Sequence, residues 1–241
     1  MTKNETLKQV LKENYSKIQK SIISKAENEY RNPGEITLVA VSKTFSSEIL
    51  KAAYEVGIRV FGENYAQELR DKIKYFEQES KQPQWHYIGH LQTNKVKYLI
   101  PFVKLIHTVD SIELAEEIDK RSSQNNIIQN VLIQVNTSGE ESKYGLEPDE
   151  TVNFAKEIQK FKRINTIGLM TIGTFSDDEK VIRKEFTLLR NLKTEINKNL
   201  GVEKFTELSM GMSHDFLIAI EEGSTILRIG TAIFGNRNYN K

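Results

Sequence analysis

The sequence predicts an α/β fold, a single (β/α)8 TIM barrel with an extra helix at the N-terminus. About eight short apolar, β-branched runs alternate with segments of helical periodicity along the chain. The chain has 241 residues, close to the roughly 250 that are typical of this fold. Most of the apolar runs are continuous, as expected of parallel strands that are buried on both faces.

The first elements are an amphipathic helix over about residues 5–30 and a strand at Ile36–Lys43. Apolar side chains recur at helical spacing in the helix, and the strand follows the turn-forming run Asn32–Gly34. No helix is obvious after the last strand, which ends at Gly230, and the N-terminal helix is expected to cover the gap. We therefore expect one domain over residues 1–241, with the barrel at about 36–235.

The other elements follow from the same two periodicities. Further strands are expected at Arg59–Asn64, Trp85–His90, Lys104–Asp110, Asn130–Asn136, Ile164–Ile172, Phe205–Met210 and Thr225–Gly230. Helices are expected at Glu48–Val56, Ala66–Glu79, Asn94–Ile100, Ile112–Ser122, Pro148–Phe161, Asp178–Asn199 and Ser213–Glu222. The alternative is an open doubly wound sheet, but no G-x-G-x-x-G follows the first strand, which weakens a dinucleotide-binding version.

Composition excludes several classes of protein. Lys+Arg 34 against Asp+Glu 33 gives a net charge of +1, so nothing indicates a nucleic-acid partner. The absence of cysteine excludes disulfides, thiolate metal sites and cysteine nucleophiles, and it fits a reducing compartment; we expect no metal and a cytoplasmic location. No stretch approaches the roughly 20 apolar residues of a membrane span, and Met1–Glu5 does not begin a signal peptide.

Polar residues stand at the ends of nearly all predicted strands. In a barrel these ends converge on one face, where function lies. Taken singly, each has a structural explanation as a helix cap or as a hydrogen-bonded residue of the rim. Their concurrence nevertheless predicts a site, formed by Lys43, Asn64, His90, Asp110, Asn136, Met170, Thr171, Ser209, Met210, Arg228, Gly230 and Thr231.

Lys43 stands out within this set because an amine at the end of a buried strand is costly to desolvate. Desolvation lowers the pKa of an amine and leaves a nucleophilic free base, which imine chemistry with an aldehyde requires. The alternative is a strand-end lysine whose ammonium extends to solvent.

The loops after the seventh and eighth strands are the usual phosphate site of this fold. Backbone N–H groups around Gly211 and Gly230, hydroxyl groups of Ser209, Ser213 and Thr231, and a helix N-terminus at Ser213 would suit a phosphate dianion. The alternative is an ordinary helix cap followed by a tight turn. A lysine across the barrel from a phosphate site suggests pyridoxal 5'-phosphate (PLP), or a sugar phosphate in a Schiff-base aldolase.

Five ordered motifs closely resemble the pyridoxal phosphate homeostasis protein family, of the YggS/PROSC type. They are Ala40–Lys43, Phe61–Glu68, Trp85–Lys95, Leu208–Asp215 and Gly223–Gly235. The resemblance covers nearly the whole chain and implies a barrel like the N-terminal domain of alanine racemases.

The resemblance also implies the cofactor and its binding residues. Lys43 would hold PLP as an internal aldimine, Arg228 would face the pyridine nitrogen and Asn64 would lie near the ring. Four residues, Ser209, Ser213, Gly230 and Thr231, would surround the phosphate, and Met210 belongs to the same motif. No role is implied for the motif residues His86, His90, Gln92 and Asn94.

The function implied by the resemblance is intracellular PLP homeostasis, with delivery of PLP to apo-enzymes, by a monomer or weak homodimer without established turnover. Arg228 fits this, because a cation at the pyridine nitrogen disfavours its protonation and weakens the ring as an electron sink. A racemase-like enzyme of low activity is the alternative, since alanine racemases have the same arginine. Racemases also need a tyrosine base from a second domain. Tyr239 is the formal candidate for that base, and the alternative is that it belongs to a disordered terminal tail.

The loop Thr137–Leu146 is the longest on the predicted functional face. Gly139 and Gly145 are candidate hinges, so the loop could be a lid, and Lys143 could be a secondary amine in cofactor transfer. The alternative is a solvated surface loop.

Overall fold

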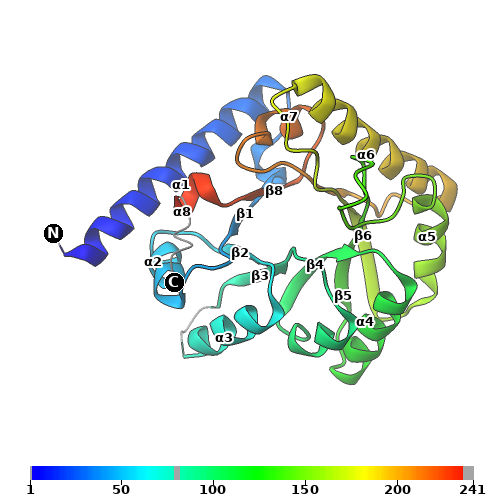
Figure 1. Cartoon of the computed structure of the whole chain (residues 1–241), viewed down its shortest axis with the longest axis horizontal. Coiled ribbons are helices and arrows are strands. Elements are labelled where there is room, and N and C mark those ends of the chain that lie inside the picture. Colours follow the sequence, from blue (N-terminus) through cyan, green and yellow to red (C-terminus); the bar gives the residue numbers. More distant parts are fainter. Residues whose placement is uncertain (1, 79–81, 236–241) are drawn as a thin grey trace.

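Eight parallel strands close into a barrel in the computed structural model of the chain, which describes residues 2–78 and 82–235 (Figure 1). Each strand pairs with the next along the sequence, and β8 (Ile226–Ile229) pairs with β1 (Thr37–Val41) to close the ring. The predicted fold class is confirmed.

The elements alternate as the sequence predicts, with short strands and longer helices. The remaining strands are β2 (Val60–Glu63), β3 (Gln84–Tyr87), β4 (Val103–Val109), β5 (Gln129–Gln134), β6 (Ile164–Met170) and β7 (Glu207–Ser209). The α-helices are α1 (Lys3–Asn28), α2 (Ser47–Glu55), α3 (Ala66–Phe76), α4 (Ile112–Gln124), α5 (Thr151–Glu157), α6 (Glu179–Leu200), α7 (Phe216–Glu221) and α8 (Thr231–Phe234). The 3-10 helices are η1 (Pro33–Glu35), η2 (Thr93–Tyr98) and η3 (Ile158–Lys160).

The eighth helix position is filled in two ways. A short helix, α8, follows the last strand, so the expectation of no helix there was wrong. The long α1 packs against α2, α7 and α8 and covers that side of the barrel, as expected (Figure 1). Asn14 on α1 fixes the contact, because its side-chain amide donates to the carbonyl oxygen of Ile233 at 3.0 Å.

Two predicted boundaries that bear on the site were wrong. Strand β1 ends at Val41, so Lys43 lies two residues beyond the strand rather than at its last residue. Helix α7 begins at Phe216 rather than at Ser213. The Asp215 carboxylate accepts the Met212 N–H at 2.5 Å, and the resulting turn delays the helix, so Ser213 is not at a helix N-terminus.

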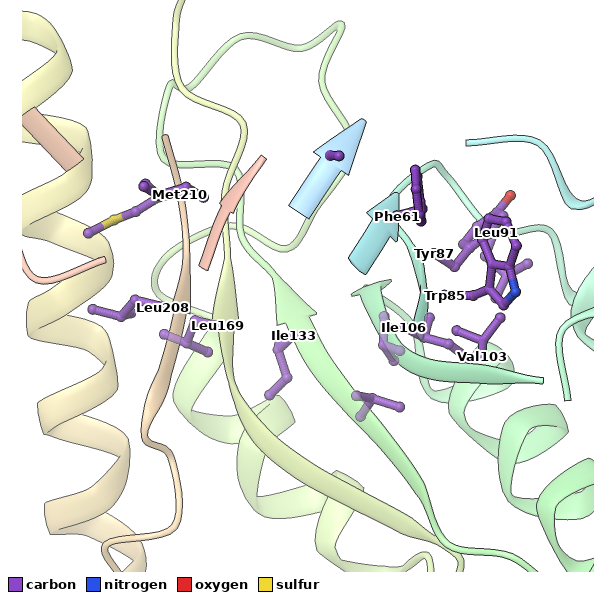
Figure 2. Packing of buried hydrophobic residues seen from close by; sticks show 14 of the residues in the cluster. Phe61, Trp85, Tyr87, Leu91, Val103, Ile106, Ile133, Leu169, Leu208 and Met210 are labelled. Atoms are coloured by element: carbon purple, nitrogen blue, oxygen red, sulfur yellow. The ribbon is translucent and has the colours of Figure 1, made fainter. Parts of the chain in front are cut away.

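Two apolar layers follow from the alternation of side chains along each strand. The smaller cluster gathers one residue from each of five strands inside the barrel: Val39, Leu105, Leu132, Met170 and Ile226. Their neighbours in sequence point outward, and Figure 2 shows several of these packing beyond the strands, among them Ile106, Ile133 and Leu169. Polar side chains in the barrel interior therefore have to form hydrogen bonds with one another, because the apolar layer inside the barrel excludes water.

None of the helices in residues 2–78 and 82–235 combines the length and the apolar composition that crossing a membrane requires.

Candidate functional site

A cavity of about 300 Å3 lies at the end of the barrel where the strands finish. This volume is at the lower end of the roughly 300–1,000 Å3 of small-molecule sites. Six of the eight predicted binding residues line it: Lys43, Asn64, Ser213, Arg228, Gly230 and Thr231. The remaining two, Ser209 and Met210, are fully buried and lie outside its lining.

Lys43 lies in a tight turn just after β1. The turn is closed by the Phe45 N–H, which donates to the carbonyl oxygen of Ser42 at 3.2 Å. Thr44 has a φ of 70°, which is unusual for a β-branched residue and is kept only where the surroundings impose it. The constraint here is Glu68 on α3, whose Oε1 accepts the Thr44 N–H at 2.7 Å.

A buried lysine on α3 supports the same turn from below. Lys72 is 3% exposed, and its ammonium donates to the carbonyl oxygen of Ser42 at 2.8 Å. It also donates to Glu63 Oε1 at 2.7 Å and to Glu68 Oε1 at 2.6 Å, while Ser42 Oγ donates to Glu63 Oε1 at 2.5 Å. Burial raises the pKa of Glu63 to about 7, and the Lys72 charge opposes that rise. Both neighbours of Lys43 are thus held by one buried ionic cluster.

Arg228 forms the floor of the cavity. Its Nη1 donates to Ser209 Oγ at 2.6 Å and its Nη2 to the carbonyl oxygen of Thr171 at 2.8 Å. Burial lowers the pKa of Arg228 to about 10, so the guanidinium remains charged at neutral pH. Ser209 therefore orients Arg228 from beneath, instead of facing the cavity.

Two histidines continue this hydrogen-bond chain through the barrel interior. His107 Nδ1 lies 2.9 Å from Ser209 Oγ, and His107 Nε2 lies 2.9 Å from His86 Nδ1. Because Ser209 accepts from Arg228, its own proton is directed to His107 Nδ1, which makes Nε2 of His107 the donor to His86. Burial lowers the pKa of His86 to about 4 and holds the pKa of His107 well below its usual value, so both rings are neutral at pH 7.

Hydroxyl groups gather where the loops after β7 and β8 meet. Because β8 pairs with β1, the prediction that these loops lie across the barrel from Lys43 was wrong. Thr231 Oγ1 donates to Ser213 Oγ at 3.1 Å, and Ser213 Oγ also accepts the Ala232 N–H at 3.5 Å. Gly211 has a φ of 97°, and a Cβ there would lie 2.6 Å from Ala219 Cβ, so the loop before Ser213 needs glycine. This group of donors, beside the Arg228 charge, suits an anion.

The sequence reasoning missed the rest of the lining. The apolar walls are formed by Val41, Ile88, Ile172, Phe175 and Met212. The sequence analysis searched for polar residues at the ends of strands and therefore did not identify them. His214 also lines the cavity, with Nε2 3.3 Å from Asp215 Oδ2 and its ring 4.8 Å from that of Phe175. The signal for His214 was its place in the motif Leu208–Asp215, although no role was assigned to it there.

The predicted lid loop contacts the rim of the site. Lys143 Nζ pairs with Glu140 Oε1 at 2.6 Å and donates to the carbonyl oxygen of Gly173 at 3.1 Å, two residues before Phe175. The ring of Tyr144 stacks on His90 with 3.8 Å between centroids. Tyr239, the formal candidate for a base, lies outside the described residues.

The sequence matches known proteins along almost its full length. The family described as alanine racemase, N-terminal domain, matches residues 10–238. The chain is 42% identical to the pyridoxal phosphate homeostasis protein of Aquifex aeolicus, over 94% of this chain and 98% of that protein. It is 44% identical to the human protein of the same name, covering 85% of this chain and 78% of that one.

Solved structures agree in fold. The structure of PipY from Synechococcus elongatus with PLP bound superposes with a TM-score of 0.78 at 29% identity, covering 89% of this chain and 100% of PipY. Alanine racemase from Streptomyces lavendulae superposes with a TM-score of 0.74 at 15% identity, covering 95% of this chain and 58% of the racemase. The latter likeness is one of fold alone.

Proposed function

This chain belongs to the family of pyridoxal phosphate homeostasis proteins, which have the alanine racemase N-terminal fold, and we propose on that premise that it binds PLP in the cavity at Lys43. The observation that carries the proposal is the presence of an amine, an anion-binding group of hydroxyls and a buried arginine in one cavity of about 300 Å3. The PLP-bound relative PipY supports it, since its whole length is covered by this chain.

The lining fits the parts of PLP. Ser213 and Thr231, with the backbone at Gly230, offer donors for the phosphate. Val41 and Ile88 offer apolar contact to the faces of the ring. Arg228, held by two hydrogen bonds, places a charged donor at the floor, where we propose that it faces the pyridine nitrogen.

Lys43 supplies the covalent link. Its amine attacks the aldehyde carbon of PLP, and a C=N bond forms with the loss of one water molecule. The ionic cluster around Lys72 holds the turn on either side of Lys43, which keeps the amine directed into the cavity. Asn64 lines the same cavity and would lie beside the ring.

We further propose that the protein keeps the reactive aldehyde masked and releases PLP to apo-enzymes. Lys43 is only half-buried and Thr231 at the rim is exposed, so water can reach the site to reverse the link. Arg228 is compatible with storage, because a cation at the pyridine nitrogen weakens the ring as an electron sink. It does not by itself distinguish storage from turnover, since alanine racemases have the same arginine.

A racemase-like activity is the second candidate, and one observation favours it. His214 lines the cavity and lies 3.3 Å from Asp215, an arrangement that can orient an imidazole as a proton acceptor. Exchange of the α-proton of an amino acid in deuterated water measures this directly. If wild-type protein exchanges the α-proton and His214→Gln does not, catalysis would replace storage as the proposed function.

The absorbance spectrum tests the principal proposal. Wild-type protein mixed with PLP is expected to show a visible band, which borohydride reduction removes while fixing the cofactor on Lys43. Lys43→Ala is expected to lack the band. If wild-type protein forms no band in excess PLP, the proposal is wrong, and binding of a sugar phosphate becomes the better-supported hypothesis.

A further inference from the structure

A second hollow lies beside the Lys43 cavity and has no part in the proposed function. Its volume is about 210 Å3, and its walls are the segment that starts at Asn64 after β2 and the segment that reaches Lys95 after β3. Asn64 lines both hollows, so they share a wall. The second hollow therefore opens at the same end of the barrel.

Tyr87 fixes the two walls relative to each other. Its hydroxyl lies 2.9 Å from the carbonyl oxygen of Asn64 and 3.2 Å from that of His90. Gly89 allows the close approach, because a Cβ there would lie 2.3 Å from the Asn64 carbonyl oxygen. Since Tyr87 is 3% exposed, water does not compete for these contacts, and the hollow is preformed.

Lys95 gives the hollow a positive charge. No Asp or Glu lines the hollow, and Lys95 has no ion-pair partner within the part of the chain that the structure describes. The neighbour of its ammonium is the Tyr98 ring, at 5.9 Å from the centroid. The nearby carboxylate of Asp110 faces His90 instead, with 4.0 Å between its Oδ2 and Nδ1 of His90.

We propose that this hollow binds the carboxylate of a small acid, with Lys95 as the cation that receives it. Gln67 and Gln92 also line the hollow, and a glutamine side-chain amide can donate N–H groups to the same anion. One ammonium with neutral donors matches a single negative charge, and about 210 Å3 admits only a small molecule.

The shared wall at Asn64 narrows the class of acid. A carboxylate in the second hollow lies next to the occupant of the Lys43 cavity, so an amino acid or a 2-oxo acid would be held beside PLP. This narrower assignment rests on the proposed function, whereas carboxylate binding at Lys95 does not. It also gives a role to the motif Trp85–Lys95, which the sequence left without one.

Calorimetric titration of PLP-free protein with L-lactate and lactamide tests the site. Lactate carries a carboxylate but neither amine nor ketone, so it cannot form a Schiff base with Lys43, and lactamide is its neutral analogue. The variants are Lys95→Ala and Lys97→Ala. Lys97 is the matched control, because it lies on the same 3-10 helix, 5.1 Å from the Tyr98 ring centroid, and does not line the hollow.

We expect saturable lactate binding by wild type and Lys97→Ala. The lactate affinity of Lys95→Ala is expected to be lower by about tenfold or more, since one charge-assisted contact is lost. Lactamide is expected not to bind. Equal lactate affinity in the two variants, equal affinity for lactamide and lactate, or no saturable lactate binding by wild type each overturns the proposal. Lys95-dependent lactate binding by a protein that forms no visible band with PLP would leave this site standing and reject the proposed function alone.

Discussion

The backbone N–H of Thr44 donates a 2.7 Å hydrogen bond to Oε1 of Glu68, a residue on the helix that follows the next strand. The same oxygen accepts from Lys72, whose ammonium also holds the carbonyl oxygen of Ser42. The residues before and after Lys43 are therefore tied to one side-chain cluster. The backbone on either side of Lys43 is thus held by residues that do not line the cavity.

Glu68→Ala is expected to slow formation of the covalent link with PLP about tenfold, because the Thr44 turn loses its acceptor and Lys43 loses its fixed direction. Glu68→Gln is expected to retain most of the rate, since an amide oxygen can still accept from Thr44. Stopped-flow absorbance of the visible band measures both rates.

The control for this pair is Glu117→Ala. It removes a comparable (i,i+4) ion pair, to Arg121, from α4, away from the Lys43 turn. An equal loss of rate in Glu68→Ala and Glu117→Ala would mean that helix stability, and not the Thr44 contact, is responsible.

Ser209→Ala is expected to destabilise the protein by about 1–3 kcal/mol, because Arg228 loses an acceptor and His107 loses its partner in a buried site. It is also expected to weaken PLP binding, since Arg228 is no longer oriented. Urea denaturation and PLP titration measure the two effects.

Ser122→Ala is the matched control, because the buried Ser122 hydroxyl has no hydrogen-bond partner within the described chain. Its removal is expected to be neutral or stabilising and to leave PLP binding unchanged. Comparable destabilisation by the two variants would contradict the role given to Ser209.

The buried histidines predict acid sensitivity. The pKa of His86 is lowered from 6.5 to about 4 in the folded protein, so between these values the unfolded chain binds more protons than the folded one. The stabilisation is complete above pH 6.5 and is lost as the pH falls towards 4, by roughly 3 kcal/mol. Urea unfolding at about pH 7.0, 5.5 and 4.5 measures this loss of stability, because the first pH lies above both pKa values and the other two lie between them.

His86→Gln removes that titrating group and is expected to make the acid limb of the stability curve less steep, while His107, whose pKa burial also lowers, still contributes to it. The same slope in wild type and His86→Gln would assign the acid sensitivity to other groups.

Lys143→Ala is expected to release PLP faster, because Lys143 ties the loop 137–146 to Gly173 at the rim of the cavity. Transfer of PLP to an apo-enzyme, timed by recovered activity, measures the rate. Slower transfer would instead favour Lys143 as a secondary amine in hand-over, and an unchanged rate would remove both roles.

Most of the fold could be predicted from patterns among residues that are close in sequence. Periodicity and turn residues act over a few neighbours, so the alternation of strands and helices, the covering role of α1 and the position of Lys43 near a strand end could be read from the sequence. The start of α7 could not, because the Asp215 side chain replaces helix hydrogen bonds with a turn at Met212.

Sequence patterns predicted the barrel, the lysine near its mouth and the small-residue loops after the last two strands. The side-chain contacts that join these parts became visible only in the folded chain. His107 meets Ser209 across 102 residues of sequence, and Lys72 reaches back 30 residues to Ser42. Such contacts depend on closure of the barrel, which brings distant strands together in a region where buried polar groups must pair. No local periodicity encodes which partner each of them finds.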